Sequence, residues 1–258
     1  MTEEHKQLKY YYDKKLAILL ANKITKIHPK FQKQTFVSTV DKKTKNLDLK
    51  DRVETIADAL HEFLSVEYKK AISMLIQILG PPNENETGMF KEGYWLLPVA
   101  FFVEKYGINH FKISTDAIYE ITQRSTGEYA VRPFLIEYPK KMTTLMLKWS
   151  KSKNVHVRRL SSEGLRPRLP WAKKLEQFID DPTPILPILE NLKEDESMFV
   201  KKSVANNLND ILKDNYSIGI KVLKKWSKTK NKDTQWIIKH ALRNELKNGN
   251  KEAEKLVT

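Results

Sequence analysis

The chain has 258 residues and a formal net charge of +14 at pH 7, and 40% of its residues are hydrophobic, which is enough for a substantial core. This basic balance is typical of proteins that bind an acidic partner such as nucleic acid, although lysines scattered over an ordinary surface also contribute to it. Cysteine is absent, which excludes disulfides, thiol catalysis and thiolate metal sites.

The first six residues, Met1–Lys6, lack the apolar region of a signal peptide. No uncharged apolar run further along approaches the length of a membrane span. We therefore expect a cytoplasmic protein that makes no contact with a membrane.

Helical spacing dominates the apolar pattern. Only 8 glycines occur, strand-like alternation is hard to find, and apolar residues recur three and four positions apart. Residues 51–64 carry Ile56 and Leu60 one turn apart, and residues 68–79 repeat that register. Residues 80–93 hold two prolines and three glycines, which predicts a long loop.

An internal repeat is visible in the second half. Placing Trp149 over Trp226 aligns residues 148–154 with residues 225–231, an offset of 226 − 149 = 77 residues. Half of this offset is close to the period of HEAT and armadillo helix pairs, roughly 40 to 47 residues. The intermediate unit is then expected at residues 194–212, where apolar residues again follow a helical stripe.

Stacked helix pairs build a solenoid whose inner helices line a groove able to follow an extended ligand. We therefore predict an all-α fold: a right-handed α-solenoid of HEAT-like repeats with a concave basic groove. Residues 1–258 are expected to form a single domain of this kind, acting as a monomer.

A dense field of positive charge surrounds one carboxylate. Between Lys140 and Lys174 the sequence has eleven lysines and arginines and a single acid, Glu163. A surface that only binds a polyanion has no electrostatic use for an isolated carboxylate. Glu163 is therefore a candidate for chemistry.

Glu163 also has a structural interpretation. A helix begun near Asn154 is expected to end at Glu163, with Gly164 as its stop. An acid at the C-terminal end of a helix opposes the helix dipole, so local helix energetics do not favour it there. An ion pair with Arg159 or Arg166 is the structural alternative.

Two further carboxylates are candidates. Glu128 stands three residues after Ser125, the spacing of a capping box in which the glutamate reaches back to the serine amide. Asp210 lies one or two positions from the buried stripe of its helix, where a solvated charge is the ordinary interpretation. The spacing leaves both alternatives open.

Tryptophan in an α-solenoid most often packs in the core or between repeats, and Trp149, Trp171, Trp226 and Trp236 are all interpreted that way first. Trp171 is the better candidate for stacking on a base, because it closes the basic run after two prolines that resist helix. No histidine spacing suggests a metal site, and no phosphate-binding loop or nucleophile turn occurs.

Several motifs resemble the AlkC-type branch of the DNA alkylation repair glycosylases, which are built from HEAT-like repeats. They are long, follow one order and cover most of the chain. The motifs are residues 47–53 (LDLKDRV), 56–61 (IADALH), 127–135 (GEYAVRPFL), 156–171 (HVRRLSSEGLRPRLPW), 203–211 (SVANNLNDI) and 240–243 (HALR).

The resemblance implies a monofunctional glycosylase that hydrolyses the N-glycosidic bond of cationic alkylated bases in double-stranded DNA. The implied substrates are 3-methylcytosine and 3-methyladenine, and no cofactor or metal is implied. Some family members carry an immunoglobulin-like domain after the repeats. This sequence has no strand-rich extension, so we expect DNA contacts made by that domain to be absent or replaced.

The family's acidic residues map onto Glu128, Glu163 and Asp210. Carboxylates near the sugar stabilise the positive charge that develops there, and one of them can orient or deprotonate water. We assign the water to Asp210. Trp171 and Arg159 are expected to contact the substrate, and the residues expected to bind DNA are Arg158, Arg166, Arg168, Lys151, Lys153, Lys173 and Arg243.

Two other function classes remain open from the sequence. A non-catalytic HEAT-type module would bind nucleic acid in a salt-sensitive manner without releasing bases. A protein scaffold would hold an acidic peptide in its groove, and DNA would compete for that groove. We rank both below the glycosylase, because the three carboxylates lie in recognisable motifs.

Overall fold

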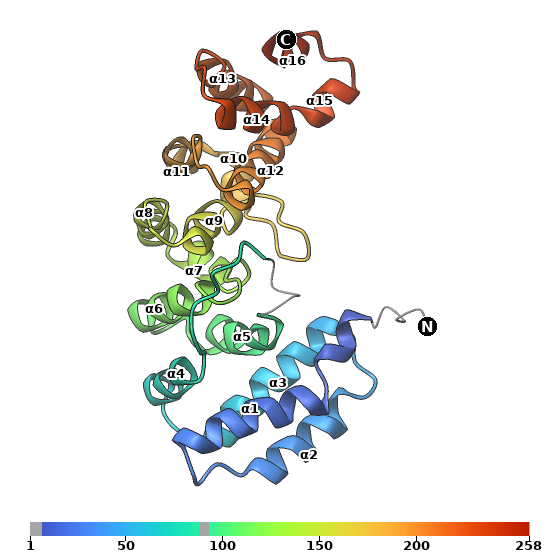
Figure 1. The fold of residues 1–258 in the computed structure, drawn as a ribbon, viewed down its shortest axis with the longest axis vertical. Coiled ribbons are helices and arrows are strands. Elements are labelled where there is room, and N and C mark those ends of the chain that lie inside the picture. Colours follow the sequence, from blue (N-terminus) through green and yellow to red (C-terminus); the bar gives the residue numbers. More distant parts are fainter. Residues whose placement is uncertain (1–6, 88–92, 258) are drawn as a thin grey trace. The chain divides into compact units, whose positions relative to one another are not determined.

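The computed structural model describes residues 7–87 and 93–257. Every regular element in these residues is a helix, which confirms the all-α prediction (Figure 1). Part of the loop expected at residues 80–93, residues 88–92, lies outside the described residues. None of the described helices combines the length and apolar composition needed to cross a bilayer.

The chain divides into two compact units, Met1–Val131 and Arg132–Thr258. Each unit is an array of helices, most of them joined by short turns, as in HEAT-like repeats. That all 258 residues form one domain stays a prediction.

The first unit contains six α-helices and two short 3-10 helices among its described residues. Consecutive helices pack on one another, α1 on α2 and α2 on α3, and α3 then packs on α5. The elements are η1 (Leu8–Tyr11), α1 (Lys14–Ile27), α2 (Lys33–Thr44), α3 (Leu49–Leu64), α4 (Tyr68–Gln77), η2 (Tyr94–Leu96), α5 (Leu97–Tyr106) and α6 (Phe111–Thr122).

The second unit carries most of the predicted site. Its central helix, α12, packs against α9 on one side and α14 on the other, while α11 and α13 also contact α12. The elements are α7 (Arg132–Glu137), α8 (Pro139–Trp149), α9 (Val155–Glu163), α10 (Glu176–Asp180), η3 (Thr183–Ile185), α11 (Leu186–Leu192), α12 (Met198–Asp214), α13 (Tyr216–Trp226), α14 (Lys232–Ala241), α15 (Arg243–Lys247) and α16 (Lys251–Val257).

The predicted helices match the observed ones closely. The helix expected over residues 51–64 is α3, and the one expected over residues 68–79 is α4, which ends two residues earlier, at Gln77. The intermediate repeat expected at residues 194–212 contains α12, whose Val200, Val204 and Leu208 are fully buried. Burial of this stripe holds α12 between its neighbours.

The 77-residue repeat is a repeat of structure. In the helix pairs α8 and α9, α11 and α12, and α13 and α14, we call the first helix outer and the second inner. Trp149 and Trp226 each end an outer helix, α8 and α13, and both are buried, as predicted for packing residues. Asn154 and Asn231 then cap α9 and α14 in the same way, each side chain accepting hydrogen bonds from two backbone amides of the first turn. Such caps set where each inner helix begins.

Candidate active site

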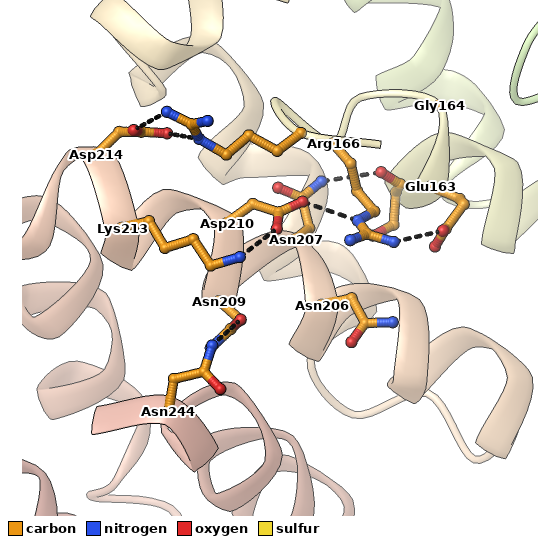
Figure 2. Close-up of polar contacts among 12 residues, drawn as sticks. Glu163, Gly164, Arg166, Asn206, Asn207, Asn209, Asp210, Lys213, Asp214 and Asn244 are labelled. Atoms are coloured by element: carbon orange, nitrogen blue, oxygen red, sulfur yellow. Dashed lines mark hydrogen bonds and ion pairs between the residues drawn. The ribbon is translucent and has the colours of Figure 1, made fainter. Parts of the chain in front are cut away.

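Two of the predicted carboxylates share one arginine. Arg166, in the loop after α9, donates from Nη1 to Glu163 Oε1 at 2.8 Å and from Nε to Asp210 Oδ2 at 2.9 Å (Figure 2). Glu163 is the last residue of α9 and Asp210 lies on α12. The packing of α9 against α12 therefore brings together groups that lie far apart in the sequence.

These groups are withdrawn from water. Glu163 is 6% exposed and Asp210 is 2% exposed, and Arg166 is also buried. Charges in such surroundings are retained only when they are paired and hydrogen-bonded. The guanidinium of Arg166 supplies both the opposite charge and the hydrogen bonds. Its single positive charge faces the two negative charges of Glu163 and Asp210.

The two carboxyl groups have opposite shifts in their acidity. Burial raises the pKa of Asp210 above its ordinary value, although Arg166 and Lys213 act against this rise. Burial also acts to raise the pKa of Glu163, but the charges of Arg159 and Arg166 outweigh it and lower that pKa. Asp210 is therefore the stronger base of the pair.

Only one oxygen of Asp210 is occupied by Arg166. Oδ2 accepts the guanidinium hydrogen bond, whereas Oδ1 forms an ion pair with the Nζ atom of Lys213, 3.7 Å away. Among the described residues, no hydrogen-bond donor reaches Oδ1. This oxygen can accept a proton from an outside molecule.

Amide side chains tie the inner helices together around this pair. Asn207 donates to the backbone carbonyl of Ser162 at 2.9 Å, which joins α12 to α9. Asn209 donates to the carbonyl of Ala241 at 2.7 Å, which joins α12 to α14. Both amides are buried, so these bonds fix the rotation of α12 and hence the direction of Asp210.

The structural alternatives of the three carboxylates have different outcomes. The ion pair of Glu163 is present, to Arg166 at 2.8 Å and to Arg159 at 3.9 Å. The solvated interpretation of Asp210 is wrong, because its side chain is buried. The predicted end of α9 at Glu163 is confirmed, and Gly164 follows with a right-handed φ of −64°.

Glu128 is buried in a turn before Val131, at the end of the first unit. A capping box needs a helix that begins directly after Ser125, but the next helix, α7, starts at Arg132. The Ser125 hydroxyl instead donates to the carbonyl of Gly93. The capping-box interpretation is therefore wrong. The structure brings Glu163 and Asp210 together, and the place of Glu128 in the same site stays a prediction.

Two of the arginines that the sequence assigned to DNA are paired with carboxylates. Arg158 is paired with Asp195, with Nε 2.6 Å from Oδ2, and Arg168 forms a two-pronged pair with Asp214 at 2.6 and 2.7 Å. The sequence did not predict Asp195 and Asp214 as partners, because spacing along the chain does not show which residues of the next repeat face these arginines. The signal for Asp214 was its place one helical turn after Asp210.

Hydrogen bonds from Arg132 hold the loop between α9 and α10. Arg132 donates to the carbonyls of Gly164 and Arg166, at 3.2 and 3.0 Å, and to that of Lys173. Trp171 is 70% exposed in this loop and has a left-handed φ of 64°. This backbone conformation costs a non-glycine residue roughly 1 to 2 kcal/mol, and the surrounding contacts sustain it.

The remaining predicted contacts lie at the surface or near it. Lys151, Lys153 and Lys173 are exposed. The guanidinium of Arg159 lies over the ring of Phe199, 4.5 Å from its centroid, and close to Glu163. No group of three or more histidine or acidic side chains in the described part of the chain is arranged to hold a metal ion.

Comparison with known proteins shows the family of this chain. The DNA alkylation repair enzyme family matches residues 125–244, a range that contains all three predicted carboxylates. The structure of Pseudomonas fluorescens AlkC, an alkylpurine DNA glycosylase bound to DNA containing an abasic site analog, is 32% identical in sequence with a TM-score of 0.90. The match covers 98% of this chain and 68% of that chain. This chain belongs to the DNA alkylation repair enzymes.

Two other relatives extend the likeness. YhaZ of Bacillus subtilis (strain 168) is 42% identical over 247 residues, which cover 95% of this chain and 66% of that protein, just under two thirds of its length. AlkD2 of Streptococcus mutans is 21% identical with a TM-score of 0.55, covering 82% of this chain and 97% of that chain. The likeness to AlkD2 supports the helical-repeat fold alone. AlkC therefore carries the functional comparison.

Proposed function

We propose that this DNA alkylation repair enzyme is a DNA glycosylase that hydrolyses the N-glycosidic bond of cationic alkylated bases in duplex DNA. The expected substrates are 3-methylcytosine and 3-methyladenine, and the expected acting form is a monomer. The observation that carries the proposal is the buried pair of carboxylates, Glu163 and Asp210, held by one arginine in a member of this family.

The opposite pKa shifts suit the two carboxylates to different roles in the reaction. Two titratable groups whose surroundings push their pKa values apart serve different roles in acid–base chemistry. Asp210, with its raised pKa and its available Oδ1, is suited to take a proton from water. Glu163, with its lowered pKa, stays ionised and stabilises positive charge on the base and the sugar.

The reaction needs little acid catalysis on the leaving side. A cationic base departs with the electron pair of its glycosidic bond and becomes neutral without gaining a proton. Positive charge then grows on the sugar, where anionic groups lower its energy. The water oxygen bonds to the anomeric carbon, and the proton released from that water passes to Asp210.

Arg166 positions the carboxylates in this proposal. Its guanidinium is buried between Glu163 and Asp210, with Nη1 and Nε engaged. It fixes the direction of both groups and offsets part of their mutual repulsion. The DNA contact expected for Arg166 from the sequence stays a prediction, which would have to use the remaining N–H groups.

The decisive experiment is chromatographic detection of free bases after incubation with methylated duplex DNA. Release of 3-methylcytosine or 3-methyladenine by the native protein, and loss of release in Asp210→Asn, supports the proposal. Unmethylated duplex serves as the control substrate. If folded protein binds the methylated duplex but releases neither base, the non-catalytic DNA-binding alternative replaces the glycosylase.

A further inference from the structure

A closed loop, residues 164–175, connects α9 to α10 and carries both Arg166 and Trp171. Its two limbs meet at the base, where the amide of Leu175 donates to the carbonyl of Pro167 at 3.0 Å. The base of the loop is buried, whereas the tip around Trp171 is exposed. Contacts at the base therefore decide where the exposed tip lies.

One buried guanidinium, that of Arg132, bridges the two limbs. Nη1 donates to the carbonyls of Gly164 and Arg166, on the outgoing limb, at 3.2 and 3.0 Å. Nε donates to the carbonyl of Lys173, on the returning limb, at 2.9 Å, and Nη2 donates to the same carbonyl. A guanidinium offers five N–H donors in one fixed plane, an arrangement that an ammonium group cannot reproduce. Arg132 therefore holds the limbs together in a way that lysine could not.

The returning limb has exposed side chains on a backbone that is held. Lys173 and Lys174 are exposed, and Trp171, two residues before Lys173, has a left-handed φ of 64°. A non-glycine residue keeps this conformation only where the surrounding contacts determine it. The hydrogen bonds from Arg132 to the Lys173 carbonyl supply such contacts two residues away.

The outgoing limb connects Arg132 to the carboxylate pair. Arg132 holds the backbone carbonyl of Arg166. The side chain of Arg166 in turn donates to Glu163 and Asp210 (Figure 2). Gly164, whose carbonyl Arg132 also holds, directly follows Glu163. A shift of the Arg166 backbone would therefore move the guanidinium that is hydrogen-bonded to both carboxylates.

We propose that Arg132 is a positioning residue of the glycosylase reaction. It acts through the backbone of Arg166 on the direction of Asp210, and through the backbone of Lys173 on the direction of Trp171. This assigns a role to the arginine of the motif at residues 127–135. The proposal rests on the proposed function, since the reaction that Arg132 serves is base release.

A second arginine separates positioning from ordinary structural support. Arg52, on α3, is 4% exposed, as is Arg132, and it also holds backbone carbonyls. Its Nε, Nη1 and Nη2 atoms donate to the carbonyls of Leu47, Tyr12 and Lys45, at 2.7, 3.3 and 3.0 Å. These residues belong to the first unit, whereas the carboxylate pair belongs to the second. Arg52→Lys should therefore cost stability without changing the reaction.

The first test compares single-turnover base release by Arg132→Lys and Arg52→Lys, with circular dichroism to confirm folding. Arg132→Lys should release methylated bases roughly 100-fold more slowly, because a small displacement of reacting groups costs about that much. Its acidic limb of the pH–rate profile should also move to higher pH, since a displaced Arg166 lowers the pKa of Asp210 less. Arg52→Lys should keep the native rate and the native limb. The native rate in folded Arg132→Lys, or equal losses in Arg52→Lys, overturns the positioning role.

The second test needs no base release. Trypsin cleaves after lysine and arginine, and mass spectrometry locates each cut. The native protein should resist cleavage after Lys173 and Lys174, although both side chains are exposed, because the backbone is held there. In Arg132→Lys these cuts should be at least about tenfold faster, since losing a hydrogen bond to a charged group raises the open population by that order. Arg52→Lys should keep the native rate at both sites.

Hydrogen exchange in the native protein covers the case in which Arg132→Lys does not fold. The amide of Leu175 should be protected, and exchange as fast as in an unfolded chain overturns the proposal. Cleavage after Lys173 and Lys174 at the native rate in folded Arg132→Lys overturns it as well. A native protein that releases no base would instead overturn the glycosylase, while the cleavage rates still decide whether Arg132 holds the loop.

Discussion

Arg166 and Asp210 are joined by a buried hydrogen bond of 2.9 Å, although 44 residues separate them in the chain. The bond connects the loop after α9 to the middle of α12, the helix that packs against α9. Arg166 holds Glu163 at the same time. The geometry of both carboxylates therefore depends on a cation that the sequence assigned to DNA phosphates.

Asp210→Asn should abolish most of the base release and leave DNA binding intact. The amide keeps the shape of the side chain but cannot take a proton from water. General-base catalysis contributes roughly 10²- to 10⁴-fold to a rate, and we expect a loss of that order in single-turnover base release. Anisotropy with unmethylated duplex is the binding control, and unaltered release would remove Asp210 from the reaction.

Arg166→Gln should move the acidic limb of the pH–rate profile to higher pH. Arg166 acts to lower the pKa of Asp210, which burial raises, so removing the guanidinium raises this pKa further. Only ionised Asp210 can accept the proton, so the rate falls at a higher pH than in the native protein. Arg168→Gln, which breaks a pair with Asp214 instead, is the comparison variant.

If the acidic limb of the pH–rate profile does not move in Arg166→Gln, then Arg166 does not control the ionisation of Asp210. The same variant should also be less stable, by about 3 to 5 kcal/mol, because it removes the cation that is hydrogen-bonded to both buried carboxylates. Urea unfolding measures this loss, and the kinetic profile is then recorded under conditions where the variant is folded.

The stability conferred by Glu163 should disappear in acid. Its pKa is lowered in the folded protein, so ionisation of Glu163 stabilises the fold above its unfolded pKa, about 4.3. This contribution is lost as the pH falls through the lower, folded pKa. Urea unfolding should therefore show a stability gap between native protein and Glu163→Gln that is full at pH 7 and shrinks below about pH 4.3.

Glu137→Gln, which removes an exposed carboxylate at the end of α7, corrects that comparison for the change in net charge. A gap between native protein and Glu163→Gln that is independent of pH would show that the carboxylate is not held ionised by its arginines.

Trp171→Ala should weaken base release with little change in stability. The indole is 70% exposed, so little apolar burial is lost, and we expect the free energy of unfolding to change by less than about 0.5 kcal/mol. A contact of the indole with the lesion or its sugar would be lost. Native turnover in this variant would leave Trp171 without a role in the substrate site.

The two equivalent helix caps should have similar energetic weight. Asn154→Ala and Asn231→Ala each leave two first-turn amides without their side-chain acceptor. Each should lower the free energy of unfolding by about 1 kcal/mol, measured in urea. Asn191→Ala, which removes a side-chain hydrogen bond to Ser150 without touching a cap, is the comparison. A negligible loss in both cap variants would show that the asparagines do not stabilise the inner helices.

Local signals in the sequence were sufficient to predict two helices of the second unit, α9 and α12. Helical periodicity identified α12 through Val200 and Val204, and the aligned Trp149 and Trp226 revealed a repeat whose outer helices end alike. Periodicity and caps act over a few residues, so they can be recognised in one chain without coordinates. The membership of Glu163 and Asp210 in one site came from the family motifs.

The pairing of charges was decided by tertiary packing. The sequence showed a field of arginines around one acid, whereas packing against the next repeat supplies Asp195, before α12, and Asp210 and Asp214, on α12, as partners. Charge interactions depend on distance and burial, and residues 37 to 46 positions apart acquire both only when the helices stack. The same stacking gave Asp210 and Glu163 their opposite pKa shifts.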